Sequence, residues 1–243
     1  MAFVFSRHVQ VNGIQDATIR YKWDDWDVES VDMPLDEGQQ QLLGRLSQRA
    51  ICAFTTGTAE WILYRFARLS DDPFPLQCLE TAWTQIVNFN YAPHKDIRIE
   101  DWTGPVRGPV GVAIRRVKFA IQQADVCGDP AWRTGRIVKL AEHVLPDPAP
   151  YKQWRDRILA RLLALYPMDA DEKLGEVVPR EALDPDLAFD ISQTENLINR
   201  FLAGLDYRMN PCLNSPDQMR QQGFQGVPYV FSIEQDRKQR FDW

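Results

Sequence analysis

The strongest constraint on the fold is a repeat of apolar residues in the middle of the chain. Successive apolar positions are spaced four, three, four and three residues apart, at Val110, Ile114, Val117, Ile121 and Ala124. This spacing puts all of them on one side of an α-helix, which has about 3.6 residues per turn. It excludes a strand, in which side chains alternate between two faces. The segment therefore predicts an amphipathic helix with one buried face.

The same period recurs along most of the chain. Further helical stripes cover residues 42–54, 61–69, 76–87, 132–144, 151–165 and 197–205. The first two stripes are joined through Gly57, which weakens a helix, so they form either one helix or two. Prolines and polar residues at 144–150, 166–186 and 209–218 separate the later helices. The sequence thus predicts a mostly α fold, a compact array of about seven helices.

Both ends of the chain predict a minor β element. Residues 9–11 and 19–23 alternate apolar and polar side chains, and Asn12-Gly13 between them is typical of a hairpin turn. Residues 227–233 (VPYVFSI) have the composition of one further strand. Because an isolated hairpin is only marginally stable in water, we expect the N-terminal hairpin and the C-terminal strand to form one small antiparallel sheet.

Length and composition fit one globular domain. The 243 residues are 44% apolar and 26% charged, which is typical of a folded protein. We expect a single domain over residues 1–243 that divides, if at all, into sub-lobes 1–104 and 105–243. No apolar run is long enough to cross a membrane, and the N-terminus lacks the basic start of a secretory signal. The four cysteines form no CxxC pair, which favours free thiols and a cytoplasmic location.

Residues 100–119 (EDWTGPVRGPVGVAIRRVKF) are the part of the chain that looks most like a ligand-binding loop. A phosphate-binding loop needs free backbone N–H groups, which Pro105 and Pro109 lack. The glycine spacing also misses the dinucleotide and Walker patterns. Gly108-Pro109 is therefore predicted to begin the central helix. Arg107 beside this helix N-terminus is a candidate anion-binding residue.

Few residues favour catalysis. The three histidines form no HExxH motif, and the chain has neither a GxSxG nor a protease cysteine signature. The densest His/carboxylate group is His94 with Asp96, Glu100 and Asp101, which is able to supply a general base or ligands for a hard cation. Such residues are also ordinary in a solvent-facing connection. We predict no catalytic residue, no metal and no cofactor, and keep a hydrolase-like enzyme with an interhelical His94 site as the alternative.

Charge is distributed unevenly along the chain. Residues 23–44 contain seven acidic and no basic side chains, whereas residues 107–161 hold 11 basic and 5 acidic ones. The basic helices either face acidic segments of the same molecule or solvent, or they attract an anionic partner. A net charge of −6 and the lack of a nucleic-acid-binding motif argue against a nucleic acid partner.

The acidic run carries two tryptophans, Trp23 and Trp26. Aromatic side chains among carboxylates suit docking onto a basic protein surface, because charge sets the encounter rate and aromatic residues supply the binding energy. The predicted partner-binding set is Trp23, Asp24, Asp25, Trp26, Asp27, Glu29 and Asp32. We therefore predict a non-catalytic intracellular protein that binds another protein. In its narrowest form it is an immunity-type protein that covers the basic active cleft of a toxin, and a structural subunit of a larger assembly is a further alternative.

Overall fold

The computed structural model describes residues 3–16, 18–28, 31, 37–93, 101–126 and 128–241. Within these ranges the chain is mostly helical, as predicted, and forms nine α-helices. They are α1 (Glu37–Leu43), α2 (Gln48–Phe66), α3 (Phe74–Val87), α4 (Gly104–Asp125), α5 (Ala131–Val144), α6 (Ala149–Leu165), α7 (Thr194–Ala203), α8 (Pro216–Gln221) and α9 (Ile233–Phe241). The predicted stripe 42–54 is not one helix, because the non-helical residues 44–47 divide it between α1 and α2. Helices α8 and α9 are additional to the predicted array.

Helix α2 is the centre of the fold. Every residue of α2 except Tyr64 is buried, because α3, α4, α5 and α6 pack around it. A helix that is enclosed in this way needs apolar or small side chains on all sides, and Thr55 and Thr56 meet that need by bonding to the backbone of their own helix. Thr55 donates to the Ile51 carbonyl at 2.7 Å. The helix continues through Gly57, which decides between the two predicted alternatives in favour of one helix.

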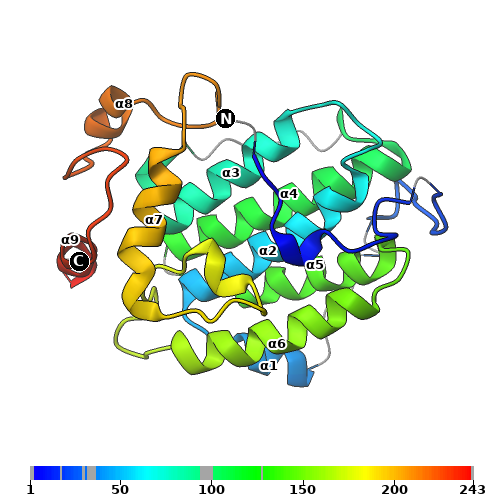
Figure 1. Ribbon diagram of the computed structural model, residues 1–243, viewed down its shortest axis with the longest axis horizontal. Coiled ribbons are helices and arrows are strands. Elements are labelled where there is room, and N and C mark those ends of the chain that lie inside the picture. Colours follow the sequence, from blue (N-terminus) through cyan, green and yellow to red (C-terminus); the bar gives the residue numbers. More distant parts are fainter. Residues whose placement is uncertain are drawn as a thin grey trace.

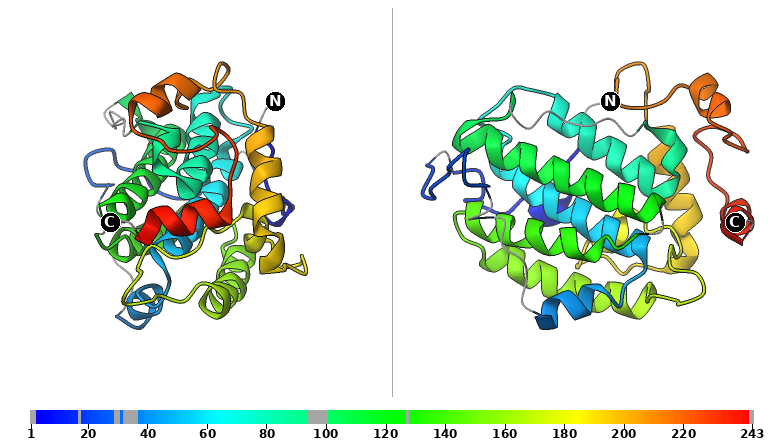
Figure 2. Two further views of the ribbon diagram at one scale, coloured as in Figure 1. Left: turned by 90° about the vertical axis from the view of Figure 1, so that its left-hand side faces the viewer. Right: turned by 180° about the vertical axis from the view of Figure 1, so that it is seen from behind.

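The remaining helices occupy distinct sides of this centre. In Figure 1, α7, α8 and α9 gather at one edge, and residues 18–28 lie at the opposite edge beside the start of α4. Figure 2 shows the same separation from behind. The main hydrophobic cluster runs from Val9 to Leu183 and includes residues on both sides of position 104. A smaller cluster, which includes Ile198, Met219 and Phe231, joins α7 and α8 to the segment before α9.

One carboxylate is fully buried in the middle of α2. Glu60 has no exposed surface, and it accepts hydrogen bonds from the backbone N–H of Ser6 and from the guanidinium of Arg180. A buried charge is tolerated only when it is paired and hydrogen-bonded. Glu60 therefore holds the N-terminal segment and the 3-10 helix η5 (Arg180–Leu183) against the same side of α2.

The predicted N-terminal hairpin is wrong within the described residues. Residues 3–16 and 18–28 form a 3-10 helix η1 (Arg7–Val9), turns and irregular chain. Their backbone groups pair with side chains of α2 in place of a second strand. The guanidinium of Arg65 donates to the carbonyls of Asp16 and Thr18, the second at 2.9 Å. The alternating apolar residues pack against the helices and not within a sheet, and Val9 is wholly buried.

The predicted C-terminal strand is wrong as well. Tyr229 has φ = 61°, which is incompatible with an extended strand. The side-chain amide of Asn199 replaces a strand partner, since it donates to the Phe231 carbonyl and accepts from the Phe231 N–H, both at 2.8 Å. The residues described at the two ends of the chain therefore form no common sheet.

Helix α4 begins at Gly104, four residues before the predicted start, and Pro109 lies inside it. An interior proline has no N–H, so the carbonyl of Pro105 loses its usual partner one turn later. The hydroxyl of Tyr21 donates to this carbonyl instead. The N-terminal segment thereby compensates for the proline in α4. Burial of the same hydroxyl raises the pKa of Tyr21.

Helix α9 is held by a buried ion pair. Arg49 at the start of α2 donates to both carboxylate oxygens of Asp236, at 2.7 and 2.9 Å. The same guanidinium donates to the carbonyls of Val87 and Gly175, at 3.0 and 3.2 Å. Both members of the pair are less than a tenth exposed. The sequence of α9 is otherwise strongly polar, so this pair is a buried attachment of α9 to the start of α2.

Candidate functional site

The acidic tryptophan segment forms a tight turn at the edge of the molecule. The N–H of Asp27 donates to the carbonyl of Asp24 at 3.2 Å, and the Asp24 carboxylate accepts the N–H of Trp26 at 2.9 Å. Asp24, Asp25 and Asp27 are exposed. The Trp26 side chain lies at the tip and is 98% exposed. We call residues 23–27 the acidic turn.

Two residues of the acidic turn attach it to α4. The Asp25 carboxylate accepts the N–H of Gly104 with both oxygens at 3.0 Å, and it accepts the indole N–H of Trp23 at 2.8 Å. Thr103, at the N-cap position of α4, makes no capping bond of its own, so Asp25 supplies the anion that a helix N-terminus favours. The Trp23 ring covers Gly108 so closely that a Cβ there would lie 2.3 Å from the indole nitrogen.

The predicted partner-binding residues therefore divide into two roles. Trp23 and Asp25 make internal contacts that position the turn. Asp24, Trp26 and Asp27 are presented to solvent. Glu29 and Asp32, which belong to the same predicted set, lie outside the described residues.

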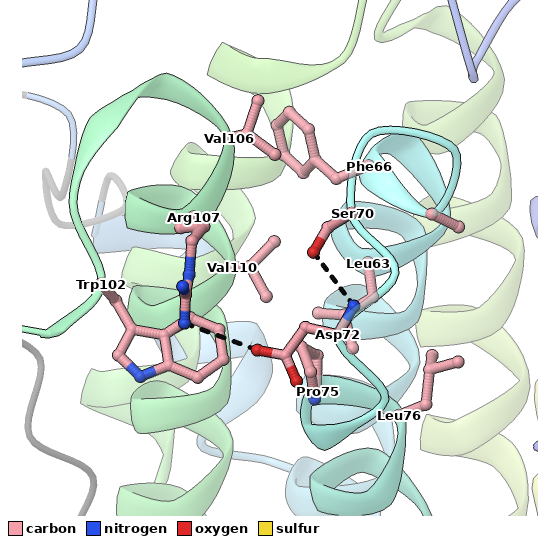
Figure 3. Close-up of a pocket in the computed structure, with 11 residues that line it drawn as sticks. Leu63, Phe66, Ser70, Asp72, Pro75, Leu76, Trp102, Val106, Arg107 and Val110 are labelled. Carbon is pink, nitrogen blue, oxygen red and sulfur yellow. Dashed lines mark hydrogen bonds and ion pairs between the residues drawn. The ribbon is translucent and has the colours of Figure 1, made fainter.

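A small apolar cavity lies between the end of α2, the start of α3 and the first two turns of α4. Its volume is about 60 Å³. The residues that line it are Leu63, Phe66, Ala67, Ser70, Asp72, Pro75, Leu76, Trp102, Val106, Arg107 and Val110. Figure 3 shows Val110 between Phe66 on one side and the Arg107–Asp72 pair on the other.

Arg107 and Asp72 face each other across this cavity. The guanidinium lies over the Trp102 ring, with its carbon 5.0 Å from the ring centroid, and contacts the Asp72 carboxylate at 3.4 Å. The other Asp72 oxygen accepts the N–H of Phe74 at 3.0 Å at the start of α3. Asp72 is therefore fixed in orientation, whereas Arg107, half-exposed, is held by a long ion pair and by its stacking on Trp102.

Sequence reasoning singled out Arg107 but missed Asp72 and Trp102. An aspartate just before a helix is typical of capping. Its position in the sequence therefore does not reveal that Asp72 also pairs with Arg107. Trp102 has 7% of its surface exposed and packs against Gly111, where a Cβ would lie 2.7 Å from its own Cβ. Only the small residue at position 111, one of three glycines in this stretch, hinted that a large side chain crosses the helix here.

The alternative His94 site cannot be assembled from the described part of the chain. His94, Asp96 and Glu100 lie outside it, and Asp101 is described and exposed. Among the residues that the structure does describe, no group of three or more His, Cys, Asp or Glu side chains is placed to hold a metal ion.

A second, more polar cavity of about 320 Å³ lies between the end of α6, the segment that follows it, and α9. Its acidic side chains have structural partners. Glu172 accepts the N–H of Gly175 with both oxygens at 3.1 Å, and Glu176 pairs with Arg237 at 2.9 Å. The Arg237–Glu176 pair joins α9 to the 167–176 segment, and the Glu172–Gly175 bonds lie within that segment.

No family model, curated protein or solved structure matches this chain. Among the described helices, none combines the length and the apolar content that crossing a bilayer demands.

Proposed function

We propose that this chain is a non-catalytic, intracellular protein that binds another protein through the acidic turn. The observation that carries the proposal is the 98% exposure of Trp26 on a turn whose neighbours are tied to α4. An indole is among the side chains that contribute most to binding when a partner buries it. Because its side chain is almost fully exposed, Trp26 has no packing role in the stability of this fold.

The attachment of the turn favours binding energetically. A partner must order the residues it contacts, and each flexible side chain that it immobilises costs about 0.5–1.5 kcal/mol. Here the bonds from Asp25 to Gly104 and Trp23 already fix the backbone of the turn. A partner that buries Trp26 therefore has to order its side chain but not the backbone of the turn.

The charge of the turn indicates the chemistry of the partner. Asp24, Asp25 and Asp27 give the surface around Trp26 a negative potential, which attracts a basic protein surface and raises its association rate. The narrower hypothesis is an immunity-type protein whose turn covers the basic active cleft of a toxin. It is a proposal that rests on this charge and on the exposed indole alone.

The test compares the wild-type chain with Trp26→Ala, Asp24→Asn and Asp27→Asn variants on a resin exposed to native cell extract. A protein that is retained by the wild type is then purified and its affinity measured. We expect Trp26→Ala to weaken binding by about 2 kcal/mol or more, a factor of about 30. The two charge variants should chiefly slow association at low salt.

Trp132→Ala is the matched control, since that side chain is 43% exposed on α5. Its removal should leave the affinity unchanged. The proposal fails if no protein is retained, or if the retained protein binds the Trp26 and Trp132 variants equally well.

A further inference from the structure

Two cysteines that are far apart in the sequence lie side by side in the fold. Cys78 is in α3, and Cys212 is in the segment between α7 and α8. Cys78 is 5% exposed, Cys212 is half-buried, and neither forms a disulfide. The thiol of Cys78 donates a hydrogen bond to the sulfur of Cys212. Because a disulfide needs two sulfur atoms that approach each other, this contact defines a dithiol, which we call the Cys78–Cys212 pair.

Polar side chains hold the segment that carries Cys212 on α3. The side-chain amide of Asn210, which is 2% exposed, donates to the Gln77 carbonyl at 3.0 Å and to the Glu80 carboxylate at 2.8 Å. The Gln77 amide donates in return to the Met209 carbonyl at 3.3 Å. The N–H of Cys212 then donates to the Asn210 side chain at 2.9 Å. These bonds surround position 78 on α3, so the chain itself brings the two sulfur atoms together.

The two thiols have unequal surroundings. The bond to Cys212 and burial raise the pKa of Cys78, while the ammonium group of Lys118 in α4 acts in the opposite direction. Cys78 therefore keeps its proton at neutral pH and donates it toward Cys212. A thiolate is the nucleophile in thiol chemistry, and a hydrogen-bond donor favours the charged form of its acceptor. Cys212, the more exposed of the two, is thus the thiol that reacts first with an oxidant, and Cys78 is placed to react second.

We propose that the Cys78–Cys212 pair is a site of reversible oxidation by hydrogen peroxide. The Cys212 thiolate attacks one peroxide oxygen and the O–O bond breaks, so that Cys212 becomes a sulfenic acid while the other oxygen leaves as hydroxide and takes up a proton. The Cys78 sulfur then attacks the Cys212 sulfur, and its proton goes to the departing hydroxide, which leaves as water. Both thiols are thereby oxidised to one disulfide, and the peroxide is reduced to water.

The disulfide would fasten α3 covalently to the segment that precedes α8. In a reducing compartment such a bond is usually transient, because other thiols reopen it by exchange. Arg208 and Met209 are exposed at the start of this segment. Oxidation should therefore slow trypsin cleavage after Arg208 by about ten-fold, since the segment then opens less often. The inference is independent of the acidic turn and of any protein partner.

The test treats the full-length chain with equimolar hydrogen peroxide at neutral pH. Remaining thiols are blocked with N-ethylmaleimide in denaturant, and the peptides are mapped by mass spectrometry. The chain should lose the mass of two hydrogen atoms, and a peptide that joins Cys78 to Cys212 should appear. Dithiothreitol should restore both thiols. Burial raises the pKa of Cys52 to about 12, so this thiol is the internal control and should remain reduced.

Variants separate the pair from its surroundings. Cys212→Ser keeps a small polar side chain at a half-buried position and should leave Cys78 reduced after the same treatment. Asn210→Ala releases the segment from α3 and should slow disulfide formation by about ten-fold, since the sulfur atoms then meet less often. Asn199→Ala is the matched control, because its side chain bonds to Phe231 and not to the Cys212 segment. Its removal should leave the rate unchanged.

The inference is overturned if peroxide leaves both thiols reduced, if it links Cys78 or Cys212 to any other cysteine, or if either sulfur is oxidised to a sulfinic acid without a disulfide. Equal rates in the Asn210 and Asn199 variants would contradict the anchoring of the segment by Asn210. Equal trypsin cleavage after Arg208 in the reduced and oxidised chains would show that the disulfide does not restrain the segment.

Discussion

The imidazole of His8 stacks on the indole of Trp154, with 5.2 Å between the ring centroids and 13° between the ring planes. Trp61 lies on another side of the same imidazole, at 6.1 Å. Both ring nitrogens are buried and have no hydrogen-bond partner among the described residues. Burial lowers the pKa of His8 to about 4, although Glu60 acts in the opposite direction and Arg180 adds to the decrease. His8 is therefore a neutral packing residue at neutral pH.

This burial predicts a loss of stability in acid. In the unfolded chain His8 has its ordinary pKa of 6.5 and is protonated below that pH. In the native state it is protonated only near pH 4. The free energy of unfolding should therefore fall by up to about 3 kcal/mol as the pH decreases through this window. Urea unfolding at several pH values measures it. His8→Phe keeps a stacked ring that cannot be protonated, and an unchanged pH dependence in that variant would contradict the assignment.

Gly57 predicts a second measurable effect. A Cβ at this position would lie 2.5 Å from Leu183 and 3.2 Å from the Trp154 ring. Gly57→Ala should therefore lower the free energy of unfolding by about 1–3 kcal/mol through overpacking, although alanine is favoured in a helix by about 1 kcal/mol. Gly44→Ala is the control, because its Cβ would meet only backbone atoms at 3.6 Å or more. Equal stability of the two variants would show that Leu183 moves aside.

The Arg49–Asp236 pair predicts how α9 is released. Removal of one member of a buried ion pair costs about 3–5 kcal/mol, and here the cost falls on a terminal helix that is able to detach. Asp236→Ala should therefore expose Arg237 and Lys238 to trypsin long before the core unfolds. Arg237→Gln breaks only an exposed pair with Glu176, worth about 0–1 kcal/mol, and still leaves Lys238 for trypsin. Similar cleavage rates at Lys238 in the two variants would argue against the buried pair as the attachment.

The bond from Asp25 to Gly104 gives a prediction for the acidic turn itself. Asp25→Ala leaves the first N–H of α4 without its acceptor and should lower the free energy of unfolding by about 1 kcal/mol. Asp24→Ala removes only a contact within the turn and should have a smaller effect. Denaturant titration of the two variants makes the comparison. An equal or larger loss in Asp24→Ala would mean that the turn is not anchored through Asp25.

Helical periodicity was sufficient to predict most of the scaffold. The apolar positions Val110, Ile114, Val117, Ile121 and Ala124 are all buried on one face of α4. The reason is local, since a repeat close to the helical turn specifies both the helix and the side that faces the core. The start of α4 was predicted too late because its proline is compensated by Tyr21, a residue 84 positions away from Pro105.

The structure of the two ends of the chain could not be predicted from the pattern of apolar residues. Alternating apolar residues indicate that side chains are buried, but they do not identify what satisfies the backbone between them. In this chain Arg65 and Asn199 do so with side-chain donors and acceptors. The cavity was unpredictable for the same reason, because Asp72 and Arg107 are neighbours only once α3 and α4 have packed.

The buried carboxylate of Glu60 also has a consequence for synthesis. Arg180, the cation that neutralises it, leaves the ribosome 120 residues later. Until Arg180 is available, Glu60 would be an unpaired charge in the interior. Packing of the surrounding helices around α2 would then gain little stability. A chain that stops before residue 180 should remain loosely packed around α2, however many of its helices are already complete.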